Sequence, residues 1–199
     1  MPPEGWDRGY VQVYTGDGKG KTTAALGLAL RAIGRGLKVL MIQFMKHWGY
    51  GEHLAARRLE PDLEIVQAGK PYLIAREEDL DEETREALGD EVVVFPPGKP
   101  PEEVVRLARD GVKLARRALE DGEVDLLILD EINVAVHYDL ISIDDVLDLI
   151  DSRPPAMELV LTGRCAPKEL VERADLVTEM KEIKHYYRRG VMARRGIEE

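Results

Sequence analysis

A glycine- and lysine-rich stretch near the N-terminus, residues 14–27 (YTGDGKGKTTAALG), has the composition of a phosphate-binding loop. The nearest pattern is the P-loop, G-x-x-x-x-G-K-[ST], in which backbone N–H groups and the lysine hold phosphates and the hydroxyl binds Mg²⁺. Gly20-Lys21-Thr22 matches the end of this pattern, but Thr15 stands where the first glycine belongs and the glycine is displaced to Gly16. The chemistry survives the displacement, because a glycine-rich turn still points successive N–H groups into one concavity that suits an anion.

The elements expected on either side of this loop support the same prediction. Residues 10–14 (YVQVY) have the composition of a strand, and a helix is expected from Thr23 to about Arg35. The N-terminus of that helix would direct its partial positive charge at a bound anion. The dinucleotide fingerprint G-x-G-x-x-G fits less well, because Lys21 replaces its third glycine. We therefore predict a nucleotide-phosphate site formed by Thr15, Gly16, Asp17, Gly18, Lys19, Gly20, Lys21, Thr22 and Thr23.

Two adjacent carboxylates, Asp130 and Glu131, follow a nearly continuous apolar run that begins at residue 124. In P-loop proteins this is the Walker-B position, where acids at the end of a buried strand lie beside the phosphates and the metal. Oxygen ligands of this kind suit Mg²⁺, so Thr22, Asp130 and Glu131 form the predicted metal site. The local chemistry leaves three uses open, which are hydrolysis, phosphoryl transfer and nucleotide binding alone.

Composition restricts the class of protein further. The chain has 199 residues, of which 44% are hydrophobic, and this fits one domain with a sizeable core. Lys and Arg number 28 against 38 Asp and Glu, and the resulting charge of −10 argues against broad nucleic-acid binding. One cysteine excludes an intramolecular disulfide framework, and no apolar run approaches transmembrane length. We expect a soluble, cytoplasmic protein with no nucleic-acid or membrane partner.

Apolar runs alternate with helical stretches along the chain. Further strands are predicted at residues 38–44, 63–67, 124–130, 157–162 and 175–180, and helices at 101–120, 143–151 and 167–173. Strands that alternate with helices indicate a parallel sheet covered on both faces. The predicted fold is therefore α/β, a P-loop, RecA-like and mostly parallel sheet within a single nucleotide-binding domain that spans residues 1–199.

Two charged segments interrupt this alternation. Residues 77–91 hold nine acids and one arginine, which we interpret as a solvated helical face or loop. The C-terminal tail, residues 181–199, is basic: between Lys181 and Arg195 it has six Lys or Arg and one acid. The tail would either lie over an anionic ligand or form a solvated terminus.

A set of motifs that runs in order from about residue 9 to the C-terminus resembles the P-loop type of ATP:corrinoid adenosyltransferases, which make adenosylcobalamin. The displaced glycine, Gly16, is the form that this family uses. The stretches that carry the resemblance are Tyr14–Ala25, Arg31–Gly34, Gln43–Lys46, Leu129–Asn133, Leu161–Arg164, Ala174–Met180, and Lys184-His185 with Gly190, Ala193 and Gly196–Glu198.

This resemblance implies an unusual use of the P-loop. In the family, cobalt(I) of a reduced corrinoid attacks the 5′-carbon of ATP, the adenosyl group moves to cobalt and triphosphate leaves. Cobalt(I) is itself a strong nucleophile, so the resemblance implies no catalytic side chain; the protein supplies proximity and stabilises the leaving group. ATP lies reversed in the family's loop, which exposes the 5′-carbon.

The resemblance also implies roles for individual residues. By position, Arg31 would contact the nucleotide sugar, and Thr22 and Glu131 would share the metal. Tyr72 and Trp48 would be the aromatic residues beside the corrin, although the neighbouring Ile74 replaces a tryptophan found in well-known members. A homodimer and a flavoprotein electron donor are the partners that the family suggests.

Three functions can be compared on these grounds. The first is an adenosyltransferase that uses ATP and a corrinoid. The second is a RecA-like P-loop ATPase that hydrolyses ATP to drive a partner, and the third is a nucleotide-dependent corrinoid carrier without catalysis. The small size of the chain and the ordered motifs favour the first.

Overall fold

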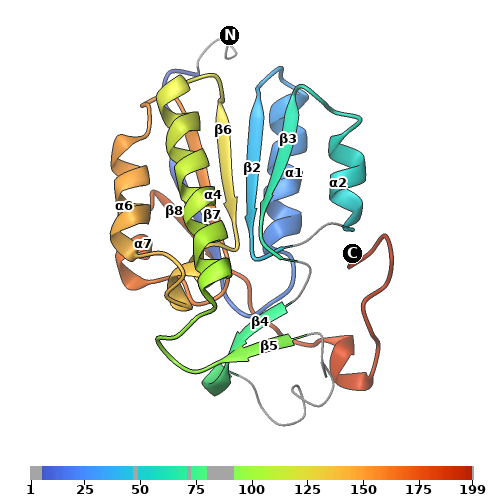
Figure 1. Ribbon diagram of the computed structural model, residues 1–199. Helices are drawn as coiled ribbons and strands as arrows, with labels where there is room; N and C mark the ends of the chain where they lie inside the picture. The colour runs from blue at the N-terminus through green and yellow to red at the C-terminus, as the bar shows by residue number, and fades with distance from the viewer. Residues whose placement is uncertain (1–5, 47–48, 71–72, 80–91, 199) are drawn as a thin grey trace.

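A central sheet of six parallel strands organises the computed structural model, which describes residues 6–46, 49–70, 73–79 and 92–198 (Figure 1). The strand order is β3-β2-β6-β7-β1-β8, and each pair of neighbours runs parallel. This topology confirms the predicted α/β class. The strands are β1 (Val11–Thr15), β2 (Val39–Phe44), β3 (Leu63–Ala68), β6 (Leu126–Asp130), β7 (Glu158–Thr162) and β8 (Leu176–Glu179).

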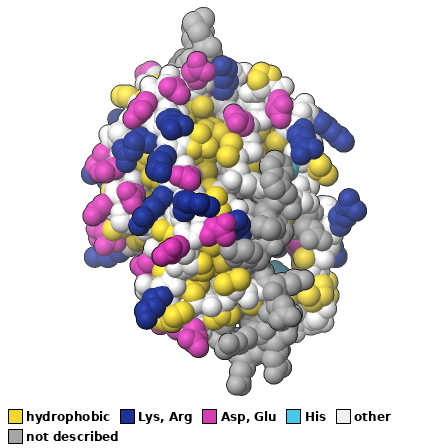
Figure 2. All heavy atoms as spheres, in the orientation of Figure 1, with side chains coloured by type: hydrophobic (Ala, Val, Ile, Leu, Met, Phe, Trp, Pro, Cys, Tyr) yellow, Lys and Arg dark blue, Asp and Glu magenta, His cyan; other side chains and the backbone are white. Residues whose placement is uncertain are grey.

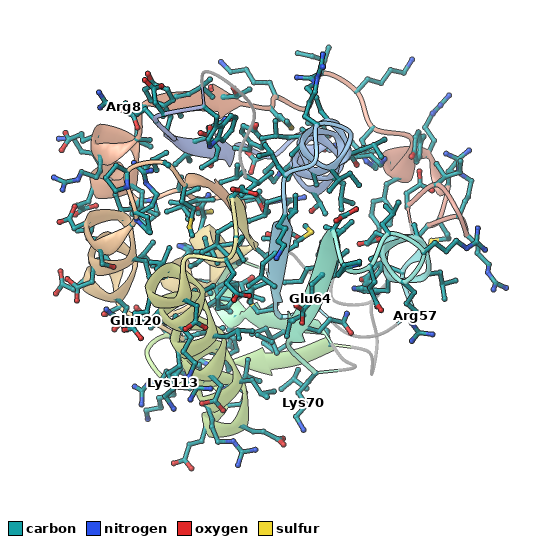
Figure 3. The ribbon with its side chains drawn as sticks, turned by 90° about the horizontal axis from the view of Figure 1, so that it is seen from above. Arg8, Arg57, Glu64, Lys70, Lys113 and Glu120 are labelled. Carbon is teal, nitrogen blue, oxygen red and sulfur yellow. The ribbon has the colours of Figure 1, made fainter. Side chains whose placement is uncertain are left out.

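Helices cover both faces of this sheet, as predicted. Seen from above in Figure 3, α1 and α4 lie on opposite sides of the strands. The helix α2 packs beside the edge strand β3, while α5, α6 and α7 share the side of α4. Their bounds are α1 (Lys21–Ile33), α2 (Gly51–Ala56), α4 (Glu102–Asp121), α5 (Ile132–His137), α6 (Ile143–Ser152) and α7 (Lys168–Arg173).

The strand β6 shows why its sequence is almost continuously apolar. Leu126 and Ile128 pack into the core on the α1 side, whereas Leu127 and Leu129 pack into the core on the α4 side. Successive side chains of a strand point to opposite faces, so a strand that is covered on both faces needs apolar residues at every position. Because β6 is buried on both faces, its last residue, Asp130, is held firmly at the carboxyl edge of the sheet.

The helix α1 begins two residues earlier than the predicted start at Thr23. Gly20 precedes it with φ 118°, a left-handed conformation that a residue with a side chain rarely adopts. The turn at Gly20 therefore places Lys21 and Thr22 in the first helical turn, where backbone N–H groups have no helical partner. The last turn of the predicted P-loop is thus also the first turn of the helix.

A second, small sheet was missed by the sequence prediction. It consists of two parallel strands, β4 (Leu73–Arg76) and β5 (Val92–Phe95), and lies beyond the carboxyl ends of the main strands (Figure 1). A short 3₁₀ turn, η1 (Glu77–Asp79), follows β4 at the start of the acidic segment. The short helices α2 and α5 were missed as well; α7 is equally short, but Pro167 marks its start in the sequence.

Charged side chains of both signs lie on the described surface. On the face shown in Figure 2, the described Lys and Arg side chains are interspersed with Asp and Glu rather than gathered into a field of one sign. Within the described ranges, no helix combines the length and the apolar character needed to cross a bilayer.

Candidate nucleotide site

A cavity of about 620 Å³ opens at the carboxyl ends of the parallel strands, where the P-loop residues lie. Ligands of open α/β sheets bind at this edge, because the loops that leave neighbouring strands converge there. Five parts of the chain build its wall: the loop after β1 with the start of α1, the segments after β2, β6 and β7, and the C-terminal tail. The lining residues are Asp17 to Thr23, Leu26, Lys46, Tyr50 to Glu52, Glu131, Arg164, Glu182, His185, Tyr187 and Gly196 to Glu198.

The predicted phosphate loop is held against the segment that follows β8. The N–H of Gly18 donates to the Met180 carbonyl at 2.7 Å, and the Met180 N–H donates to the Thr15 carbonyl at 2.8 Å. A Cβ on Gly16 would lie 2.4 Å from the Met180 carbonyl oxygen, and Gly16 also has φ 91°. The displaced glycine is therefore required by a close backbone approach as well as by the turn.

The side chain of Lys21 lies inside the phosphate loop and contacts two of its carbonyl groups. Its ammonium donates to the Gly16 carbonyl at 2.6 Å and to the Gly18 carbonyl at 3.0 Å, and the residue is only 7% exposed. Burial lowers the pKa of Lys21, and the nearby Glu131 carboxylate partly opposes this change. The geometry puts a positive charge at the centre of the cradle that a triphosphate would enter.

Asp130 is the centre of a buried hydrogen-bond network. Its Oδ1 accepts from the hydroxyls of Thr22 at 2.9 Å and Thr162 at 2.6 Å. Its Oδ2 accepts from the Lys46 ammonium at 2.6 Å and from the Gln43 amide at 3.2 Å. Because Asp130 is fully buried and both oxygens are engaged, it orients Thr22 and reaches a metal only through its neighbours or by losing a partner.

Glu131 presents a carboxylate to the same cavity. Its φ is 63°, a left-handed conformation that costs a residue other than glycine about 1–3 kcal/mol. The Glu131 N–H donates to the Thr162 hydroxyl at 3.0 Å, which fixes this turn. Burial and the adjacent Asp130 raise the pKa of Glu131, and among the described residues none hydrogen-bonds to its carboxylate. This carboxylate is thus available to bind a cation.

The C-terminal tail closes one side of the cavity. Glu182, His185 and Tyr187 line it, and so do Ile197 and Glu198 near the end of the chain. Figure 1 shows this segment running past the carboxyl ends of the strands. Of the two alternatives for the tail, the structure supports a position over the predicted ligand site.

Two of the tail's arginines pair with acids of the same segment. Arg188 contacts Glu182 at 2.7 Å, and Arg194 contacts Glu198 at 3.1 Å. These pairs occupy two of the six Lys and Arg side chains between residues 181 and 195. The tail therefore forms part of the cavity wall. None of the described tail residues that line the cavity is an arginine.

Several predicted site residues do not line the described cavity. Among them, Thr15 and Gly16 belong to the phosphate loop, and Asp130 contacts the lining residue Thr22 from within the core. Arg31 is exposed in the last turn of α1, ten residues beyond Lys21 and so about 15 Å along the helix. Its contact with the nucleotide sugar stays a prediction. Trp48 and Tyr72, the predicted aromatic contacts of the corrin, lie outside the described residues. Ile74 is half-buried in β4 and packs against the main core.

Residues that the sequence prediction did not assign complete the site. Lys46 and Gln43 come from the end of β2, Thr162 from the end of β7, and Arg164 from the loop after β7. Their signal was their position: each lies at the carboxyl end of a predicted strand. Which of these strands flank β6 depends on strand order, and the sequence alone did not give that order.

Comparisons with known proteins identify the sequences and structures to which this chain is similar. The family model for ATP:corrinoid adenosyltransferase BtuR/CobO/CobP matches residues 7–198. The chain is 33% identical over 196 residues to the corrinoid adenosyltransferase of Escherichia coli (strain K12), covering 96% of this chain and 86% of that protein. It is 32% identical over 199 residues to the corrinoid adenosyltransferase CobA of Salmonella typhimurium, again covering 96% and 86%. Among solved structures, a KaiC-like protein from Pyrococcus horikoshii covers 89% of this chain and 75% of its own, with 14% identity and a TM-score of 0.47.

Proposed function

The chain belongs to the ATP:corrinoid adenosyltransferase family, and from this premise we propose that it transfers the 5′-deoxyadenosyl group of ATP to the cobalt of a reduced corrinoid. The observation that carries the proposal is the family match from residue 7 to residue 198, which spans both the phosphate loop and the tail that meet in one cavity. ATP and the corrinoid are the two substrates, and triphosphate is the second product.

The reaction asks little acid–base chemistry of the protein. The electron pair of cobalt(I) forms the cobalt–carbon bond, the bond between C5′ and its oxygen breaks, and that electron pair leaves with the triphosphate. Negative charge therefore grows on the leaving group, so groups that already point at the triphosphate accelerate the step. The loop N–H groups, the N-terminus of α1 and the Lys21 ammonium are such groups. None of them has to accept a proton.

The described donors fit a magnesium ion chemically. The Thr22 hydroxyl and the Glu131 carboxylate are hard oxygen ligands in the cavity wall, and no hydrogen bond from the described residues reaches that carboxylate. We propose that these two residues hold Mg²⁺ and that Asp130 orients Thr22 from behind. A magnesium ion bound there supplies positive charge to the triphosphate oxygens.

The corrinoid, the partners and the location are proposed on the family resemblance. The small sheet of β4 and β5 lies next to the edge that carries the nucleotide site, and Tyr72 immediately precedes β4 in the sequence. We propose Tyr72 and Trp48 as the corrin contacts, a homodimer as the assembly and a flavoprotein as the source of electrons. The edge strand β8 exposes Leu176 and Val177, which is compatible with a second copy. A reaction that consumes ATP points to the cytoplasm.

Product analysis tests the reaction itself. Incubation of the protein with Mg-ATP and chemically reduced cobalamin should yield equal amounts of adenosylcobalamin and triphosphate, followed by absorbance and by anion-exchange chromatography. Without a corrinoid, free phosphate should not accumulate, because the electrophile is the 5′-carbon and no water is directed at the γ-phosphate. Rapid release of ADP and phosphate in the absence of corrinoid would instead support the ATPase alternative.

Glu131→Gln tests the metal assignment. Removing one anionic oxygen should raise the Mg²⁺ concentration that gives half-maximal rate by at least about tenfold. Burial and Asp130 raise the folded-state pKa of Glu131, so the folded protein binds this proton more tightly than the unfolded chain does. The free energy of unfolding therefore falls as pH rises from the pKa of Glu131 in the unfolded chain to its higher pKa in the folded protein. The glutamine variant should be at least as stable as the wild type at pH 7.

The matched control for this substitution is Glu172→Gln, an exposed acid on α7 that pairs with Lys168. It should leave the magnesium titration unchanged. An unchanged titration in Glu131→Gln as well would place the metal elsewhere. A loss of stability at pH 7 would contradict the electrostatic account of Glu131.

A further inference from the structure

Lys46 lies between Thr22, a proposed metal ligand, and Asp130, the carboxylate that orients Thr22. Its ammonium lies 2.6 Å from Oδ2 of Asp130 and 3.1 Å from the hydroxyl oxygen of Thr22. The Thr22 hydroxyl donates its own proton to Oδ1 of Asp130. One of the two lone pairs of the Thr22 hydroxyl oxygen is thus used by Lys46.

The backbone fixes Lys46 at this position through two unusual features. Met45, directly before it, has φ 57°, a left-handed conformation that is rare for a residue with a long side chain. Gly69, after β3, approaches so closely that a Cβ there would lie 2.3 Å from the Lys46 carbonyl oxygen. Strained positions of this kind persist where the surrounding structure enforces them, and they concentrate at functional sites.

Carboxylates surround the Lys46 ammonium. Asp130 pairs with it directly, and Glu131 and Glu52 line the same cavity. The side chain of Lys46 is 17% exposed, whereas Asp130 is fully buried. Lys46 therefore neutralises a carboxylate that would be costly to bury without a cation.

A lysine ammonium and a magnesium ion compete for the hydroxyl oxygen of Thr22. Both are cations that draw on the lone pairs of this one oxygen, and two positive charges bound to it repel each other. Lys46 also lines the same cavity as Lys19 and Lys21, so its flexible stem gives the ammonium a path from Asp130 toward the proposed phosphate cradle. The departure of Lys46 from Thr22 and its arrival at a phosphate would then be one movement.

We propose that Lys46 is a positioning residue that occupies the cation position beside Thr22, yields it to the magnesium ion that Thr22 and Glu131 hold when ATP binds, and then places its ammonium on the triphosphate. This inference rests on the proposed function and its magnesium site. It makes metal binding depend on the nucleotide, because the free protein carries its own cation where the metal belongs. It also adds a second lysine to the stabilisation of the leaving group.

Metal binding to the full-length protein without nucleotide tests the exchange. Mn²⁺ serves as a paramagnetic substitute for Mg²⁺, and free Mn²⁺ is followed by electron paramagnetic resonance. Lys46→Met should bind Mn²⁺ at least about tenfold more tightly than the wild type, because the competing ammonium is gone. Lys46→Gln retains a hydrogen-bond donor for Asp130 and should show the same gain, which provides a second variant if the methionine protein does not fold.

Two further arms separate this role from simple charge neutralisation. Inorganic triphosphate, titrated calorimetrically without metal, should bind at least about tenfold more weakly to Lys46→Met than to the wild type. Lys113→Met is the matched control. It removes a lysine that pairs with Asp110 on α4, on the side of the sheet opposite to α1 (Figure 3), and it should match the wild type in both titrations.

Equal Mn²⁺ affinity in the wild type and both Lys46 variants would overturn the proposal, and so would unchanged triphosphate affinity. Neither result would argue against the proposed adenosyl transfer reaction, which product analysis tests separately. Conversely, tighter Mn²⁺ binding in the Lys46 variants would support the exchange even in a protein that formed no adenosylcobalamin.

Discussion

Replacing Lys21 by alanine is expected to abolish adenosyl transfer and to weaken ATP binding roughly 10- to 150-fold. The factor corresponds to the loss of one charge-assisted contact with the triphosphate, about 1.5–3 kcal/mol. The effect on rate should be larger than the effect on binding, because charge on the triphosphate increases as the C5′–oxygen bond breaks. Lys21 is suited to this role because its ammonium is fixed inside the loop by the carbonyls of Gly16 and Gly18.

The measurements for Lys21→Ala are calorimetric titration with Mg-ATP and the rate of adenosylcobalamin formation. Lys38→Ala is a suitable control, because this exposed lysine precedes β2 at the opposite end of the strand from the cavity. It should behave as the wild type in both assays. If Lys21→Ala bound ATP within about twofold of the wild type, the assignment of residues 15–23 as the phosphate site would be wrong.

The parts of the site that could be predicted from the sequence are those in which local chemistry is sufficient. The loop at residues 15–23 can be recognised by its glycines and its Lys-Thr pair. Asp130 and Glu131 can be recognised because they follow an apolar strand. The sequence prediction did not assign Lys46 to the site, although Lys46 follows a predicted strand and belongs to a stretch that carries the family resemblance. Its contact with Asp130 exists because β2 and β6 are neighbours in the sheet, and that pairing joins residues more than eighty positions apart.

The small sheet shows a second physical limit. Residues 92–95 (VVVF) have strand composition, but β5 pairs with β4 across the acidic segment that begins at Glu77. Parallel strands have no short turn to signal their pairing, so their partners are decided by tertiary packing. The position of the tail depends on similar long-range contacts, since the hydrogen bonds between Gly18, Met180 and Thr15 connect opposite ends of the chain.

Asp130→Ala is expected to destabilise the protein more than any other single substitution considered above, by about 3–5 kcal/mol of unfolding free energy. Removing one partner of a buried ion pair leaves the other charge and its donors without compensation. Here the substitution would leave the Lys46 ammonium, the hydroxyls of Thr22 and Thr162 and the Gln43 amide without their common acceptor. Urea unfolding followed by circular dichroism gives the free energy directly.

The comparison that makes this result specific is Asp110→Ala, which breaks a lysine–aspartate contact of 2.8 Å on the exposed face of α4. Solvent screens that pair, so its loss should hardly move the unfolding midpoint. Combining Asp130→Ala with Lys46→Met should recover part of the lost stability, because the second change removes the charge that the first one strands in the interior. Equal unfolding curves for Asp130→Ala and Asp110→Ala would mean that Asp130 is not the centre of a buried network. A double variant no more stable than Asp130→Ala would mean that Lys46 reaches solvent once its partner is gone, and that the carboxylate alone holds it over Thr22.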